Sequence, residues 1–130
     1  MNAIPRDVPR DAGLGRAMAR DLLGAAELPR SAITYHTALS PLATGGTLGL
    51  ADSSWPAGTR IARHVHHDED EVVVVLSGTL EVRIAGRGLR RNPGETAFIP
   101  RNVEHEVVAL TDARAIAILT RRSLEAAQAA

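Results

Sequence analysis

Three histidines and one glutamate have types and spacing that could bind a metal. His64-Val65-His66 places two imidazoles on one side of a predicted strand, because side chains alternate between the two faces of a strand. Glu71 begins the next predicted strand, and His105 comes from a later one. Three neutral imidazoles and one carboxylate form a nitrogen and oxygen ligand set that suits a divalent transition metal. Four protein ligands leave one or two positions for water or substrate, which a catalytic metal site needs.

Each of these residues alone has a simpler interpretation. An isolated His-x-His on a strand is often a surface or structural pair. His105 lies between Glu104 and Glu106, where a solvated polar residue is expected, and Asp68-Glu69-Asp70 is most simply a solvated turn. The combined spacing of the four residues is what favours a site.

The composition excludes much other chemistry. The 130 residues contain no Cys, and all basic residues are Arg, so thiol nucleophiles, disulfides, Cys-ligated metals and lysine chemistry are excluded. The formal net charge is +0, and one Trp, one Tyr and one Phe cannot form a stacking platform for nucleic acid. No apolar stretch reaches the ~20 residues of a membrane span, and the N-terminus lacks a signal-peptide core. We therefore expect a cytoplasmic protein that binds neither nucleic acid nor membrane.

The chain has the length of one domain with one core. We expect an arm with a short helix over about 14–27 in residues 1–30, a single β-barrel in 31–122 and a tail in 123–130. Short β-rich runs separated by Gly, Pro, Asn and Asp indicate an all-β sandwich or barrel. The predicted strands span 32–39, 47–51, 60–65, 71–76, 79–84, 88–91, 96–99, 105–110 and 114–120.

The run 72–76, Val-Val-Val-Val-Leu, is apolar on both faces of its predicted strand. One face can meet the barrel interior. The other face must meet a second sheet, the N-terminal helix or another subunit. This run is the main argument from the sequence for a homodimer.

The spacing resembles the two sequence motifs of the cupin family. The first motif reads Gly, five residues, His-x-His, three or four residues, Glu, six residues, Gly, and every required position is filled. The second reads Gly, five residues, Pro-x-Gly, two residues, His, three residues, Asn; here Asn102 replaces the second Gly and Ala109 replaces the Asn. Asn tolerates the left-handed turn that Gly would make, and Ala109 lies outside the ligand set. The matching residues are Gly58, His64, His66, Glu71, Gly78, Gly94, Pro100 and His105.

This resemblance implies an all-β, jelly-roll-like barrel of the double-stranded β-helix type, usually dimeric. It also implies metal ligation by His64, His66, Glu71 and His105. In an alternative arrangement a bulged strand brings His67 into the site in place of His66, although that places His64 and His67 on opposite faces.

Fold does not set function in such a family. The favoured function is a dioxygenase acting on a small organic molecule, with one divalent metal per chain: Fe(II) first, and Mn, Ni, Zn or Cu as alternatives. The first alternative is a Lewis-acid isomerase, epimerase, lyase or cyclase, in which the metal polarises a carbonyl or hydroxyl while a base moves a proton. The second is a non-catalytic metal- or small-molecule-binding protein, and the intact ligand set counts against it.

Few other residues are candidates for the site. Tyr35 and His36 face opposite ways on an early strand, so one of them can point inward, and His36 is a weak candidate for a general base. Trp55 is interpreted as a packing residue. An arginine could hold a substrate carboxylate, and the candidates are Arg60, Arg63, Arg83 and Arg101. The scarcity of aromatic residues predicts an aliphatic pocket for a modest aliphatic or alicyclic substrate, lined by Val73, Val82, Ile84, Ile99, Val107 and Ile118.

Overall fold

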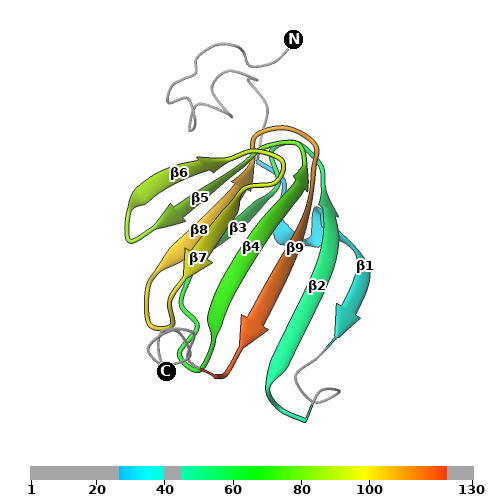
Figure 1. Ribbon diagram of the computed structural model, residues 1–130. Helices are drawn as coiled ribbons and strands as arrows, with labels where there is room; N and C mark the ends of the chain where they lie inside the picture. The colour runs from blue at the N-terminus through cyan, green and yellow to red at the C-terminus, as the bar shows by residue number, and fades with distance from the viewer. Residues whose placement is uncertain (1–26, 40–44, 123–130) are drawn as a thin grey trace.

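The computed structural model describes residues 27–39 and 45–122, which form nine β-strands and one 3-10 turn (Figure 1). No helix in these two ranges has the length and hydropathy needed to cross a membrane. The predicted helix over 14–27 lies outside the described residues except for Glu27, and so does the predicted tail 123–130. The elements are η2 (Arg30–Ala32), β1 (Thr34–Leu39), β2 (Leu48–Trp55), β3 (Arg60–His64), β4 (Asp70–Ser77), β5 (Leu80–Ile84), β6 (Arg87–Arg91), β7 (Thr96–Ile99), β8 (His105–Ala109) and β9 (Ala113–Thr120).

The strands form two antiparallel sheets that pack face to face as a sandwich (Figure 1). One sheet has the order β1-β2-β9-β4-β7, and the other has the order β3-β8-β5-β6. The chain passes from one sheet to the other between most consecutive strands, so residues far apart in sequence face a common interior. This arrangement confirms the predicted all-β, jelly-roll-like fold.

All nine predicted strands are present, and their ends differ by a few residues from the prediction. The largest difference is in β2, which is predicted to end at Ala51 and continues to Trp55. Polar side chains account for this error. Asp52 forms an ion pair with Arg114, while Ser53 Oγ accepts a hydrogen bond of 2.9 Å from the buried Trp55 Nε1. Both polar groups therefore have partners within a continuous strand.

The core lies between the two sheets and is mainly aliphatic. Val73 and Val75 of β4 are buried in it on one side, and Val82 and Val107 on the other. Burial of such a side chain stabilises the fold by about 1.5–3 kcal/mol. Since strand residues alternate between faces, Glu71 lies on the same inward face of β4 as Val73 and Val75.

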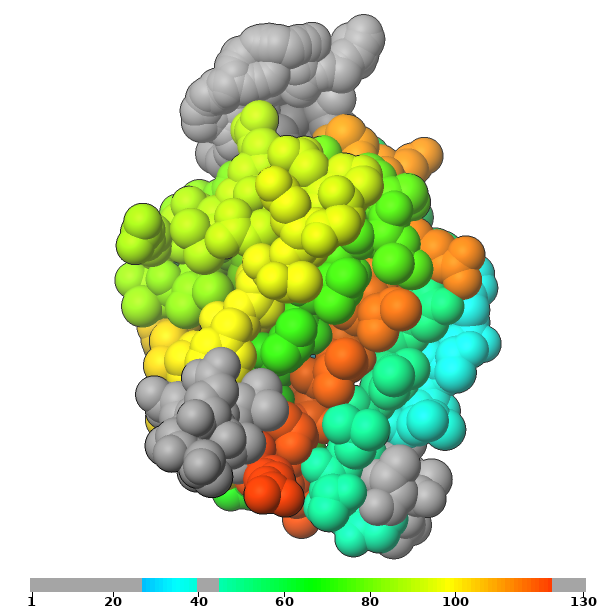
Figure 2. Space-filling model, in the orientation of Figure 1, coloured from blue at the N-terminus to red at the C-terminus, as the bar shows by residue number. Residues whose placement is uncertain are grey.

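The outer face of the five-stranded sheet carries an apolar row that crosses its strands. Figure 2 shows this face, with β7, β4, β9 and β2 side by side. The register pairs Leu39 with Leu50, Leu50 with Ile118, Ile118 with Val72, and Val72 with Phe98. β4 is therefore apolar on both faces, as its sequence predicts. The homodimer inferred from this feature stays a prediction.

Two turns have backbone conformations that their residues explain. Gly78 has a φ of +73°, and a Cβ at this position would lie 2.0 Å from the carbonyl oxygen of Asp112. Asn102 has a φ of 67°, which is the left-handed conformation predicted for this motif position. Its N–H donates a hydrogen bond of 2.7 Å to the carbonyl oxygen of His66, so this turn is attached to the predicted ligand segment.

Candidate metal centre

A cavity of about 130 Å³ lies between the sheets and contains the predicted ligand residues. Of the predicted aliphatic lining, Val73 and Val107 are present. Ala117 and Leu119 line it from β9, because they point inward while the intervening residue of β9 points outward. The predicted lining was wrong for four residues. Val82 and Ile99 lie in the core, Ile84 packs against the core, and Ile118 lies on the outer face of the five-stranded sheet.

The imidazoles of His64, His66 and His105 converge in this cavity. The ring centroid of His64 lies 4.2 Å from that of His105 and 4.9 Å from that of His66. The ring centroids of His66 and His105 are 5.1 Å apart. One ring nitrogen of each histidine lies within 4.8 Å of the other two, so the three could hold one metal ion. The pairing of β3 with β8 places His64 directly opposite His105 and thus joins two distant parts of the sequence.

Backbone carbonyl groups orient two of these rings. His64 Nδ1 lies 2.8 Å from the carbonyl oxygen of Ala62, and His105 Nδ1 lies 3.0 Å from that of Val103. Because a carbonyl oxygen only accepts, each Nδ1 carries the proton, and Nε2 is left as the metal-binding nitrogen. His105 Nε2 is buried and has no aligned hydrogen-bond partner. A buried nitrogen of this kind fits a metal ligand, since a buried polar atom otherwise has a partner.

Glu71 lies beside two of the three histidines. Its Oε1 is 3.4 Å from the Nε2 of His66 and 3.4 Å from the Nε2 of His105. Burial raises the pKa of Glu71, but its interactions with His105 and His66 outweigh burial and lower the pKa to about 2. The carboxylate is therefore charged at neutral pH and available as the oxygen ligand of the predicted set.

The pKa values of His105 and His64 shift in opposite directions. Burial lowers the pKa of His105, but the Glu71 carboxylate and the Val103 carbonyl have the larger combined effect and raise it. Burial lowers the pKa of His64, and the neighbouring imidazoles add to that effect. The Glu71 carboxylate thus favours a positive charge beside it, which protonated His105 supplies in the metal-free protein and a metal cation can supply in its place.

The structure selects between the two predicted positions of the second histidine. His66 is in the cluster, whereas His67 Nδ1 lies 3.0 Å from Asn102 Oδ1 and outside it. The alternative with His67 as a ligand was therefore wrong. Asn102, which stands where the motif usually has Gly, contacts both histidines: its N–H contacts the His66 carbonyl, and its Oδ1 contacts His67 Nδ1.

Tyr35 and His36 lie on opposite sides of β1, as predicted. Tyr35 lines the cavity, and His36 does not. His36 Nε2 instead lies 2.5 Å from Ser54 Oγ, so its side chain is not placed to act as a base in the site. Trp55 is buried and packs in the core, as its sequence interpretation predicts, and it also forms part of the cavity wall.

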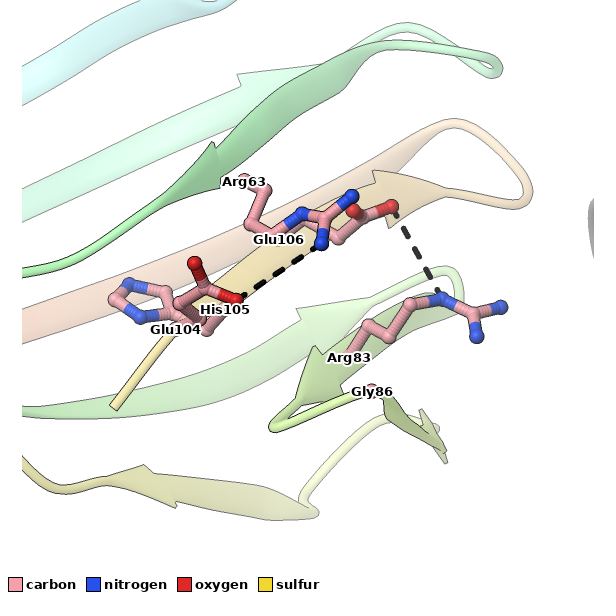
Figure 3. Close-up of a pocket in the computed structure, with 6 residues that line it drawn as sticks. All are labelled: Arg63, Arg83, Gly86, Glu104, His105 and Glu106. Atoms are coloured by element: carbon pink, nitrogen blue, oxygen red, sulfur yellow. Dashed lines mark ion pairs between the residues drawn. The ribbon is translucent and has the colours of Figure 1, made fainter.

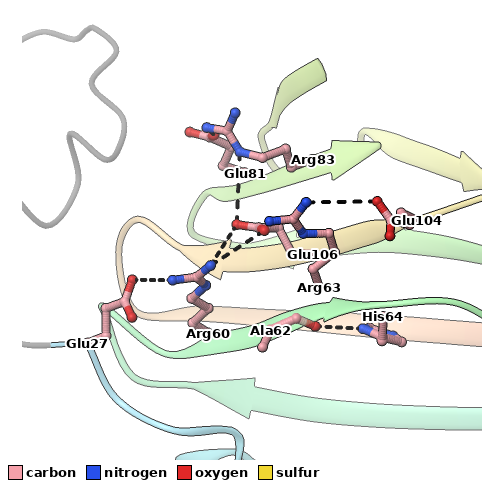
Figure 4. Close-up of polar contacts among 9 residues, drawn as sticks. All are labelled: Glu27, Arg60, Ala62, Arg63, His64, Glu81, Arg83, Glu104 and Glu106. Atoms are coloured by element: carbon pink, nitrogen blue, oxygen red, sulfur yellow. Dashed lines mark hydrogen bonds and ion pairs between the residues drawn. The ribbon is translucent and has the colours of Figure 1, made fainter. Parts of the chain in front are cut away.

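The four arginines that the sequence offers as candidates for substrate contact do not line this cavity. Figure 4 shows three of them on β3 and β5 among carboxylates. Arg63 and Arg83 line a second hollow of about 190 Å³, which His105 also lines (Figure 3). Each of the four has a carboxylate partner of its own. The ion pairs are Arg60 with Glu27 and Glu106, Arg63 with Glu104, Arg83 with Glu81 and Glu106, and Arg101 with Asp70.

The arginine that does line the cavity is Arg30, which the sequence interpretation missed. It belongs to the short turn η2, directly after Pro29. Its place is set by an isolated parallel bridge between Leu28 and Thr59. No local sequence pattern signals such a bridge, because it joins segments that are thirty-one residues apart.

Comparison with known proteins gives one family match and many structural ones. A family model described as a cupin domain matches residues 53–120, which is more than half of the chain. No curated protein sequence matches the chain. Similar solved structures include KdgF from Halomonas sp., with 23% identity, a TM-score of 0.62, and coverage of 75% of this chain and 86% of that one.

Two further structures are comparable in similarity. A predicted oxalate decarboxylase from Thermotoga maritima has 20% identity and a TM-score of 0.64, over 69% of this chain and 81% of its own. A conserved protein of unknown function from Streptococcus pyogenes has 22% identity and a TM-score of 0.63, over 74% of this chain and 81% of its own. At these identities the likeness concerns the fold alone.

Proposed function

This chain belongs to the cupin family, and on that premise we propose that it is a metal-dependent enzyme that oxidises a small organic molecule in a dioxygenase-type reaction. The observation that carries the proposal is the convergence of three imidazoles and one carboxylate on a small cavity. Two of the imidazoles have their Nδ1 atoms held by backbone carbonyls, and the buried Nε2 of His105 has the Glu71 carboxylate 3.4 Å away but no aligned hydrogen bond. These features support a ligand set that is arranged before any ion binds.

The proposed ligands are His64, His66, Glu71 and His105. Fe(II) is our preferred metal, with Mn, Ni, Zn and Cu as alternatives, because nitrogen and carboxylate ligands of this kind suit several divalent ions. When bound, such a metal supplies Lewis acidity toward the oxygen atoms of a substrate and, if it is iron, electrons for the reduction of dioxygen.

The protein's own contribution is to orient the ligands and to limit what enters. The cavity of about 130 Å³ is close in size to one that holds a single benzene ring, so a large fused planar substrate does not fit within it. Much of its wall is apolar: Val73, Val107, Ala115, Ala117 and Leu119 line it. Apolar walls favour exclusion of water and contact with an aliphatic substrate.

The residues that line the cavity support oxidation over isomerase or lyase chemistry. An isomerase or lyase needs a base that moves a proton in addition to the metal ligands. Of the cavity-lining residues that the structure describes, the ionisable ones outside the proposed ligand set are Arg30 and Tyr35. Arg30 has no acceptor atom, and neither residue is an imidazole or a carboxylate, the side chains that most often act as bases.

Oxygen uptake tests this proposal. Protein purified anaerobically and loaded with Fe(II) is mixed with a panel of small diketones and diols, and dissolved oxygen is followed. We expect stoichiometric product formation coupled to oxygen loss in the wild type and none in His64→Ala. His67→Ala is the matched control and should retain activity, because His67 contacts Asn102 outside the cluster. Turnover of a substrate by the Mn- or Zn-loaded protein without oxygen would instead establish the Lewis-acid alternative.

A further inference from the structure

Arg30 lies where the cavity meets the protein surface. It lines the cavity of about 130 Å³ and also a groove of about 730 Å³ that follows β3. Ile61 and His64 are the other two residues that line both hollows. His64 is a member of the histidine cluster, so Arg30 lines the same two hollows as one of the proposed metal ligands.

The guanidinium of Arg30 differs from those of the arginines on the neighbouring strands. Arg60, which lines the same groove, forms ion pairs with Glu27 at 2.8 Å and Glu106 at 3.3 Å (Figure 4). Within the described ranges, Arg30 has no ion pair with a carboxylate, although it is exposed and always charged. Its planar set of donors is therefore free to bind a carboxylate from outside the chain.

The charges in the cavity favour such a ligand. Glu71 is the single carboxylate among the described cavity-lining residues, and with a divalent ion bound it would offset one of the ion's two charges. Arg30 adds a further positive charge. A cavity with a net positive charge attracts anions, and its small volume restricts them to molecules of a few carbon atoms.

We propose that Arg30 determines substrate specificity by binding the carboxylate of a small oxo or hydroxy acid, whose other oxygen atoms face the histidine cluster. This inference rests on the proposed metal site and goes beyond it by naming an anionic substrate class. Arg30 differs from the candidates that the sequence offers, Arg60, Arg63, Arg83 and Arg101, because none of these four lines the cavity.

A matched pair of ligands tests the inference. Acetoacetate and acetylacetone have the same number of non-hydrogen atoms and the same β-dicarbonyl shape, but only acetoacetate carries a carboxylate. Calorimetric titrations of both ligands are carried out with wild type, Arg30→Gln, Arg30→Lys and Arg90→Gln, each with and without Zn(II). Arg90 is an exposed arginine that does not line either hollow, so its replacement makes the same change in net charge at a distance. Metal content is measured after each titration.

We expect Arg30→Gln to weaken acetoacetate binding roughly 10-fold and to leave acetylacetone binding within twofold. Arg30→Lys should give an intermediate affinity, and Arg90→Gln should match the wild type. The inference is overturned if the wild type does not bind acetoacetate more tightly than acetylacetone, or if Arg30→Gln weakens both ligands equally or neither. Loss of metal from the wild type would instead contradict the proposed metal site, and the acetoacetate comparison would still be read on the metal-free proteins.

Discussion

Asp70 Oδ1 accepts two hydrogen bonds from Arg101, one of 2.9 Å from the backbone N–H and one of 3.2 Å from Nε. Asp70 is 3% exposed and directly precedes Glu71 at the start of β4. Arg101 lies in the loop that leads into β8 and His105. This contact therefore ties the segment that carries the carboxylate to the loop that precedes the third histidine, and it fixes two sides of the site relative to each other.

Replacement of Asp70 should destabilise the protein. Asp70→Asn keeps the shape of the side chain but removes the charge that strengthens both hydrogen bonds, and we expect a loss of about 2 kcal/mol in the free energy of unfolding. Urea denaturation measures this. Glu104→Gln is the control: its ion pair with Arg63 is 3.9 Å long and exposed, so it should change stability by less than about 0.5 kcal/mol. Equal effects in the two variants would contradict the role given to Asp70.

The turn after β4 requires glycine. At Gly78, φ is +73° and a Cβ would lie 2.0 Å from the Asp112 carbonyl oxygen, so Gly78→Ala should cost about 3 kcal/mol or more. Gly86 has a similar φ of +81° and nothing within 4 Å of its Cβ position. Gly86→Ala should therefore cost about 1 kcal/mol, the backbone contribution alone. Thermal or urea unfolding of both variants separates the two contributions, and a similar loss in both would show that close packing at Gly78 is not decisive.

The stability of the metal-free protein should depend on Glu71 at acid pH. The folded pKa of about 2 lies below the ordinary value of 4.5. The stabilisation is therefore fully present above about pH 4.5 and is lost as the pH falls toward 2. The pKa of His105 is raised in the folded protein. Its contribution to stability is therefore fully present below pH 6.5 and is lost as the pH rises through its folded-state pKa.

The comparison of wild type with Glu71→Gln isolates this contribution. Between pH 4.5 and 2, the wild type should lose on the order of 2 kcal/mol more unfolding free energy than the variant. Chelator-treated protein and urea titrations at several pH values provide the measurement. Parallel pH profiles for the two proteins would show that the contact between Glu71 and the histidines does not stabilise the fold.

The sequence predicts those parts of the structure that depend on local pattern. Alternation along strands is enough to locate all nine of them and to place His64, Glu71 and Val73 on inward faces. Alternation does not show whether an inward-facing residue lies at the cavity end of the sandwich or in the packed core. For this reason Ile99 was expected to line the cavity, whereas it lies in the core. The position of Arg30 beside the site could not be predicted from local sequence pattern, because a long-range bridge between Leu28 and Thr59 places it there.

Metal content tests the central claim most directly. Protein purified and then loaded with Fe(II) or Zn(II) is desalted, and elemental analysis gives the number of ions per chain. We predict one ion for the wild type and for His67→Ala, and less than one-tenth of that for His64→Ala and His105→Ala, with circular dichroism showing that both variants are folded. Stoichiometric metal in folded His64→Ala and His105→Ala would contradict the claim that these imidazoles form the metal site.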